Sequence, residues 1–341
     1  MKEGSKHLYG VIEVSEGLDF GSIGVGGPGD QIHAVTYKKL SAIVCNTPFT
    51  DYKAVAKDLV IRHLLDHQKI IEKVMNSCSI IPFKFGSLAQ SEKEVEQILA
   101  QGYTLFQSLL PWVRDRVEFE LVATWDRERV FKTLYEEEAE IQSLQRMIES
   151  KSGGEGLAEK IKLGKLVRHA LLKRKVLFKE KILPPLKECA ESQCEHSSMD
   201  DLMILNAAFL LKKEMESEFD RRVQYLDRNL SGEVCFRLIG PLPLYSFQCI
   251  EVEWSDADRV RNALRLLGLN EGATSSDLRN AYYRKAQFLH PDKTGSLSNS
   301  PSEFEKVIEA YAFLKRYYSF HPSFVGEERI PLMGVRRNSS N

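Results

Sequence analysis

The sequence has 341 residues, which at about 150 residues per domain corresponds to two or three folded units. Hydrophobic residues make up 43% and charged residues 28%, which excludes the collagen-like, disordered and membrane-embedded classes. The 47 basic and 48 acidic residues give a formal net charge of −1. No overall field therefore attracts the chain to nucleic acid or to an anionic membrane, and we expect neither as a partner.

The sequence does not predict export or membrane insertion. The longest strongly apolar run, residues 202–211, is about half as long as the roughly 20 residues that span a bilayer. The N-terminal residues alternate apolar and polar side chains and lack the apolar core and cleavage site of a signal peptide. The six scattered cysteines do not resemble a disulfide framework. We expect a cytoplasmic chain with reduced cysteines.

The first 125 residues are predicted to mix strands and helices in the order β, β, α, β, α, β. Ser91, followed three residues later by Glu94, forms a capping-box pattern that predicts a helix from Ser91 to about Pro111. Pro82 interrupts any helix nearby, so its segment is expected to be extended. The expected strands are residues 8–14, 34–37, 40–45, 77–85 and 117–125, and the expected helices are residues 52–76 and 91–111.

Two charged helices are predicted next, at residues 126–151 and 157–183, with Pro184 and Pro185 stopping the second. Residues 155–182 contain nine Lys or Arg against three Glu. Such a run is typical of a solvated helix face, and the alternative is a docking surface for an acidic partner.

The remaining sequence predicts a second α+β region and then a small helical unit. Residues 186–201 are expected to be a loop, 202–211 a buried element, 214–226 an amphipathic helix and 234–254 a strand broken by prolines. From Ser255 the apolar spacing is helical, and the last twenty residues lack periodicity.

Three patterns could indicate a ligand. Glycines 24, 26 and 29 match a dinucleotide fingerprint, but no helix follows them, so a hairpin loop is the better interpretation. His63 and His67 have a metal-binding spacing, with structural hydrogen bonds as the commoner alternative. Cys189, Cys194 and His196 also contain metal-ligand types, in an unsuitable spacing. Because no catalytic motif emerges, we expect no enzyme activity, no metal and no cofactor.

Residues 258–318 resemble a J-domain. The segments NALRLLGL, DLRNAYYRKAQFL and FEKVIEAYAFLKR match its three helices, and an HPD loop follows the second. The resemblance implies docking on a DnaK-type chaperone and stimulation of its ATP hydrolysis. It assigns the contact to the loop and the preceding helix, that is, to His290, Pro291, Asp292, Arg279, Tyr282, Arg284 and Lys285.

The charge of the second helix agrees with that implication. Residues 276–289 carry three cations against Asp277, a surplus that favours an acidic surface in a salt-sensitive way. Tyr283 and Phe288 stand where the family has basic residues. A three-helix scaffold that does not stimulate a chaperone is the alternative interpretation.

The first 254 residues resemble the GvpF/GvpL gas vesicle protein family. The segments that carry this resemblance, in the family's order, are LYGVIEV (8–14), IIPFKFGS (80–87), VEFELVATWD (117–126), LNAAFLL (205–211) and LIGPLPLYSF (238–247). Leu242 and Leu244 replace an aromatic residue and a proline of the last signature. The resemblance implies a ferredoxin-like N-terminal domain, a second α+β domain with long helices, and a minor component or assembly accessory of the vesicle.

We therefore expect an α+β protein with an all-α J-domain. Its expected parts are residues 1–126 and 127–254 as two family domains, 255–320 as the J-domain and 321–341 as a flexible tail. The expected function is to bind hydrophobic gas vesicle shell and accessory proteins, limit their aggregation during nucleation and recruit a DnaK-type chaperone at the vesicle. A general J-domain co-chaperone for unfolded clients is the alternative.

Overall fold

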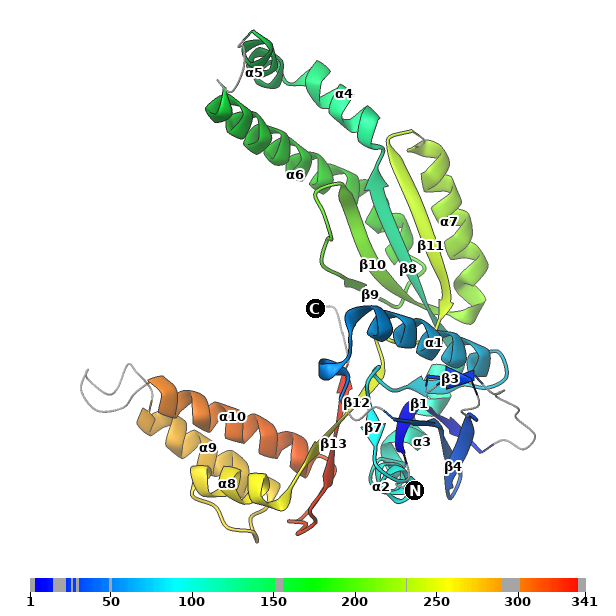
Figure 1. Ribbon diagram of the computed structural model, residues 1–341, viewed down its shortest axis with the longest axis vertical. Helices are drawn as coiled ribbons and strands as arrows, with labels where there is room; N and C mark the ends of the chain where they lie inside the picture. The colour runs from blue at the N-terminus through cyan, green and yellow to red at the C-terminus, as the bar shows by residue number, and fades with distance from the viewer. Residues whose placement is uncertain are drawn as a thin grey trace. The chain divides into compact units, whose positions relative to one another are not determined.

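The computed structural model describes residues 4–14, 23–25, 27–28, 31–48, 51–150, 156–230, 232–289 and 301–336 (Figure 1). Two compact units make up the chain. The first joins the residues up to Arg114 with Gln248–Arg336, and the second is Asp115–Phe247. The expected α+β class is confirmed in both units, whereas the ferredoxin-like detail stays a prediction. Among the described residues, no helix combines the length and the apolar character that crossing a bilayer requires.

An antiparallel sheet of strand order β4-β5-β1-β6 forms the centre of the first unit, and β7 also pairs with β1. Strand β1 is buried over most of its length, and Gly10 within it allows a close approach to β6, because a Cβ there would lie 2.5 Å from the Ile80 side chain. The strands are β1 (Ser5–Glu13), β4 (His33–Tyr37), β5 (Leu40–Thr47), β6 (Ile80–Pro82) and β7 (Leu88–Ala89), with a small hairpin of β2 (Ile23–Gly24) and β3 (Gly27–Pro28).

Three helices pack against this sheet: α1 (Lys57–Met75), α2 (Glu92–Gln101) and α3 (Tyr103–Arg114), with a 3-10 turn at Tyr52–Ala54. The predicted cap of α2 is confirmed. The Ser91 hydroxyl accepts a hydrogen bond from the Glu94 backbone N–H, and the Glu94 carboxylate accepts one from the backbone N–H of Gln90.

The second unit is a sheet of order β11-β8-β10-β9 with helices on it. Its core contains the aromatic side chains of Phe119, Trp125, Phe178, Phe209 and Phe219. Its elements are β8 (Arg116–Trp125), α4 (Arg127–Glu137), α5 (Ala139–Glu149), α6 (Leu157–Lys187), β9 (Ser192–Glu195), β10 (Met203–Lys212), a 3-10 turn (Lys213–Met215), α7 (Glu216–Asn229) and β11 (Val234–Leu242).

Four local expectations about this unit are wrong. The single helix expected over residues 126–151 is two helices, because the backbone of Glu138 is extended between α4 and α5. Strand β8, expected within the first family domain, is a central strand of the second sheet, paired with β10 on one side and β11 on the other. The segment expected to be a loop contains β9, which pairs with β10. Helix α6 continues through Pro184 and Pro185 to Lys187, because Ile182 and Leu186 are fully buried in the core and hold its last turns in place.

The helices of the J-domain-like segment are α8 (Ala257–Leu267), α9 (Ser275–Leu289) and α10 (Pro301–Tyr318). Strand β12 (Cys249–Ser255) precedes them, and β13 (Ile330–Arg336) follows and pairs antiparallel with β12. The expectation of a flexible tail is therefore wrong for residues 330–336. Ile330 and Leu332 are buried in the core that α8, α9 and α10 share, which accounts for an ordered strand without obvious periodicity.

We call β12 and β13 together the ribbon, and several contacts join it to the rest of the first unit. Phe83 forms a parallel bridge with Ile250, and the Trp254 indole donates a hydrogen bond of 2.6 Å to the carbonyl of Leu88. The Arg329 guanidinium lies 2.7 Å from the Glu94 carboxylate and stacks over the Trp254 ring. The three helices are thus attached at both ends, through β12 and through β13.

A buried pair of histidines connects α1 to the first sheet. His7 Nε2 on β1 lies 2.9 Å from His67 Nδ1 on α1, and both residues are essentially inaccessible to solvent. Burial lowers the pKa of His67 to about 4 and that of His7 well below its usual value. His67 therefore makes a structural hydrogen bond with His7, which was the alternative to a metal site. His63 lies one helical turn away on α1.

We predict that replacing Leu332 by alanine lowers the free energy of unfolding by about 2–5 kcal/mol, because the substitution leaves a cavity beside α8 and α10. Urea unfolding followed by circular dichroism measures this change. The matched control is Glu328→Ala, an exposed position in the same segment, which should leave the midpoint unchanged. Equal midpoints for both variants would show that β13 contributes no stability.

We also predict that stability falls as the pH drops from about 6.5 to about 4. In this range the unfolded chain binds protons that the buried, neutral histidines exclude, so acid favours unfolding. The pKa shift of His67 alone corresponds to a loss on the order of 3 kcal/mol. Urea midpoints across this range should show a weaker pH dependence in His67→Gln and an unchanged one in His169→Gln, an exposed control. An equally steep dependence in His67→Gln would contradict the assignment.

Candidate functional site

Capping interactions position α8 and α9. Asp256 accepts a hydrogen bond of 2.7 Å from the Arg259 backbone N–H at the start of α8, and Gly268 ends this helix in the left-handed region at φ 71°. At the start of α9, Thr274 N donates to the Asp277 carboxylate at 2.9 Å, and Asp277 N donates to the Thr274 hydroxyl at 3.3 Å. The hydrogen bonds from Thr274 hold the pKa of Asp277 below its usual value.

Aromatic residues fix α9 against α10. The rings of Tyr282 and Tyr311 stack with centroids 4.0 Å apart, and the Tyr318 hydroxyl donates to the carbonyl of Ala273 at 2.9 Å. Leu278 and Ala281 of α9 face the shared core. Among the described residues, these contacts set the orientation of α9 about its own axis and leave Arg279 and Arg284 exposed.

The structure does not bring the four predicted α9 contact residues onto one surface. Arg279 and Arg284 are exposed. Tyr282 stacks on α10, and the Lys285 ammonium donates a hydrogen bond to the carbonyl of Leu266 in the last turn of α8, where a cation complements the helix dipole. The predicted loop residues His290, Pro291 and Asp292 lie outside the described residues. The role of all seven in chaperone binding stays a prediction.

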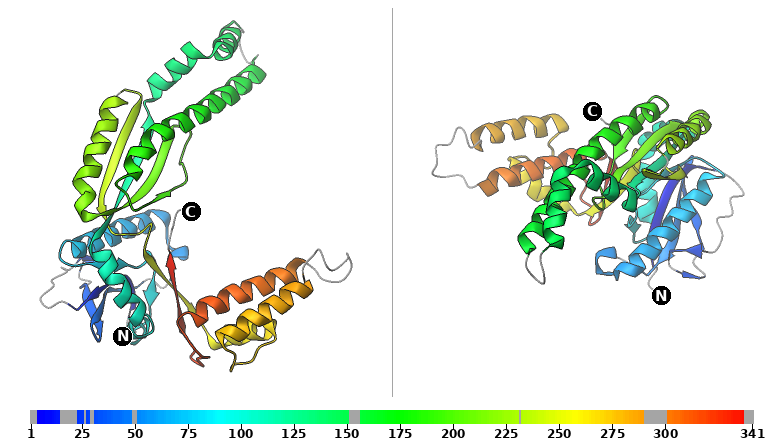
Figure 2. Two further views of the ribbon diagram at one scale, coloured as in Figure 1. Left: turned by 180° about the vertical axis from the view of Figure 1, so that it is seen from behind. Right: turned by 90° about the horizontal axis from the view of Figure 1, so that it is seen from above.

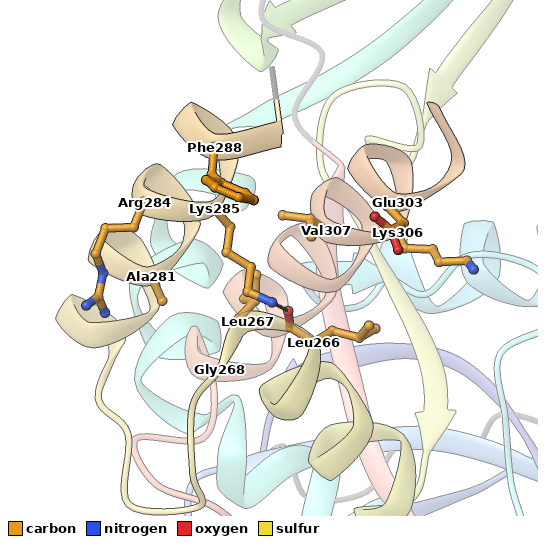
Figure 3. A pocket seen from close by; sticks show the side chains of 10 residues that line it. All are labelled: Leu266, Leu267, Gly268, Ala281, Arg284, Lys285, Phe288, Glu303, Lys306 and Val307. Atoms are coloured by element: carbon orange, nitrogen blue, oxygen red, sulfur yellow. Dashed lines mark hydrogen bonds between the residues drawn. The ribbon is translucent and has the colours of Figure 1, made fainter. Parts of the chain in front are cut away.

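A groove of about 690 Å³ lies between the three helices (Figure 3). Figure 3 shows the Phe288 ring and the Lys285 side chain directed into it, whereas the guanidinium of Arg284 points away. Phe288 is 72% exposed. The groove is lined by Leu266, Leu267, Gly268, Ala281, Arg284, Lys285, Phe288, Glu303, Lys306 and Val307.

This groove combines an apolar lining with the cations Lys285 and Lys306 and the Glu303 carboxylate, so it is suited to an apolar segment that carries acidic groups. The sequence does not display this groove, because Phe288 stands out there only as the replacement of a basic residue. The available signal was a large apolar side chain, Phe288, among the polar positions at the end of α9.

A second polar cluster lies in the second unit. The Glu118 carboxylate is fully buried and accepts two hydrogen bonds from Ser246, 2.8 Å from the backbone N–H and 2.7 Å from the hydroxyl. Burial raises the pKa of Glu118 to about 8. His196 Nε2 lies 3.3 Å from the same hydroxyl. Leu242 and Leu244, which shortly precede Ser246 in the sequence, are both buried. The apolar side chains at these two signature positions therefore contribute to packing.

The candidate metal ligands do not converge. Across the described part of the chain, no group of three His, Cys, Asp or Glu side chains is arranged to hold a metal ion. The Cys189 thiol donates to the carbonyl of Leu186 at the end of α6, whereas Cys194 lies on β9.

Two family models match this sequence. The model for the gas vesicle synthesis protein GvpL/GvpF covers residues 5–248, and the DnaJ domain model covers residues 262–318. Gas vesicle protein F of Nostoc sp. is 26% identical over 189 residues, which are 54% of this chain and 77% of that protein. The chaperone protein DnaJ of Roseobacter denitrificans is 40% identical over 55 residues, which are 16% of this chain and only 14% of that protein.

The fold has a solved counterpart. The crystal structure of the gas vesicle protein GvpF from Anabaena sp. matches with a TM-score of 0.55 and 22% sequence identity, and the match covers 71% of this chain and 97% of that one. The matched family region is more than half of the sequence, and the HPD context predicted the domain that follows it. The chain therefore belongs to the gas vesicle synthesis protein GvpL/GvpF family and carries a DnaJ domain at residues 262–318.

Proposed function

We propose that this chain is an assembly accessory that binds hydrophobic gas vesicle shell and accessory proteins, limits their aggregation during nucleation and recruits a DnaK-type chaperone to them. The family implies association with gas vesicles, and the J-domain implies a DnaK-type partner. The observation that supports the combination most strongly is that one chain carries both. The proposed role consists of binding, with no reaction catalysed by the chain itself, and takes place at vesicles forming in the cytoplasm.

The ribbon supports a direct transfer of the client, a shell or accessory protein, to the chaperone. Because β12 and β13 attach the J-domain at both ends to the first unit, a chaperone bound there is kept near a protein bound to the N-terminal part of that unit. Such a link raises the effective concentration of the chaperone at its client without any additional contact.

We assign the binding of the client, a hydrophobic shell or accessory protein, to exposed apolar residues on α1. Ile61, Leu64 and Leu65 are 56%, 43% and 51% exposed and lie within about one helical turn of each other. A cluster of this kind covers apolar surface on a partner that would otherwise self-associate.

We predict that the intact chain accelerates steady-state ATP hydrolysis by the DnaK-type chaperone of the same organism and that shell protein increases the effect. His290→Gln should return hydrolysis to the unstimulated rate. The double variant Ile61→Ser, Leu65→Ser should keep the basal stimulation but lose the increase due to shell protein, because only the client surface is changed. The matched control is Met199→Ser, another exposed apolar position, which should behave as the unchanged chain.

Circular dichroism of each variant verifies that it is folded. Equal hydrolysis with the unchanged chain and with His290→Gln would contradict recruitment through the J-domain. An equal increase with unrelated unfolded proteins would instead favour the general co-chaperone.

A further inference from the structure

An exposed face of α6 combines three apolar and two cationic residues, and we call it the basic stripe: Ile161, Lys165, Arg168, Leu172 and Val176. Successive members are three or four positions apart, which places them along one side of the helix. The apolar members Ile161, Leu172 and Val176 are 52%, 50% and 56% exposed. The stripe thus presents side chains that a soluble helix normally turns towards a partner.

The buried face of α6 packs within the second unit, which holds the stripe in place. The N-terminal half of α6 runs beside α5, and its C-terminal half lies on the sheet (Figure 2). Leu171 and Phe178 are buried in the core, and Arg174 forms ion pairs with Glu137 and Glu233 at 2.8 and 3.2 Å. A partner would therefore meet a rigid surface and bind with little loss of conformational entropy.

Carboxylates of this chain already approach one edge of the stripe. Lys179 forms an ion pair with Glu195, and Arg168 lies 3.8 Å from Asp201. Within the described residues, Lys165 and Lys173 form no ion pair, and both are exposed. The internal contacts show that carboxylates fit this face. Lys165 belongs to the stripe, and Lys173 lies beside it, three positions before Val176.

We infer that the basic stripe is a docking site for an acidic amphipathic helix of a partner protein. Apolar side chains of that helix would pack between Ile161, Leu172 and Val176, and its carboxylates would flank them opposite Lys165 and Lys173. Three exposed apolar residues beside two cations form too narrow a face to embed in a lipid surface. Nucleic acid would use the cations but not the apolar members, and the stripe contains no aromatic residue on which bases stack.

The test uses the full-length chain and a labelled synthetic helix of about 18 residues, a length that matches the stripe at 1.5 Å per residue. This peptide carries leucine every three or four positions and glutamate between them, and fluorescence anisotropy at about 0.15 M salt measures its binding. Lys165→Glu with Lys173→Glu should weaken binding at least tenfold and create binding to the matching lysine peptide. Leu172→Ser should weaken both interactions.

The matched control is the double reversal Lys69→Glu with Lys132→Glu, which makes the same charge change at exposed positions on α1 and α4. It should bind the acidic peptide as the unchanged chain does. Equal affinity of the stripe variant and this control would overturn the inference. The inference would also be overturned if the chain bound anionic vesicles or duplex DNA through the stripe but did not bind the peptide. Self-association that depends on the stripe, measured by sedimentation, would overturn it as well. Because the assay contains neither chaperone nor nucleotide, its failure leaves the proposed function untouched.

Discussion

The antiparallel pairing of β12 with β13 is the constraint on which the arrangement of the first unit depends. These strands are separated by the whole J-domain, so their pairing closes a long loop, and the entropy lost must be offset by the contacts that closure creates. The burial of Ile330 and Leu332 against α8 and α10 supplies part of that stabilisation. The ion pair between Arg329 and Glu94 and the hydrogen bond from Trp254 to Leu88 join the closed loop to the N-terminal part of the unit.

The residues of α9 expected to contact the chaperone divide into two groups. Lys285 and Tyr282, both expected to contact the chaperone, hold α9 against α8 and α10, whereas Arg279 and Arg284 remain exposed. The chain as a whole is almost neutral, so an acidic partner responds to local groups of cations and not to the net charge. Exposed cations of this kind are Arg279 and Arg284 on α9 in the first unit, and Lys165 and Arg168 in the basic stripe of α6 in the second.

Local patterns predicted the elements well, and contacts between distant segments account for what they missed. The capping interaction of Ser91 with Glu94 and the helices around the HPD loop depend on residues a few positions apart, so the sequence displays them directly. The strand character of β8 was also evident, but its pairing with β10 and β11 depends on segments about 80 to 120 residues away. The groove and the buried Glu118 carboxylate likewise arise from side chains that only the fold brings together.

We propose above all that a family region for gas vesicle synthesis and a working J-domain act together in one chain. Vesicle yield in cells tests it most directly, measured by buoyancy and electron microscopy with the unchanged chain and with Asp292→Asn at equal protein levels. We expect fewer vesicles with the Asp292→Asn variant and more shell protein in the insoluble fraction. A full yield of vesicles with the variant would contradict it and would leave the three helices as a scaffold.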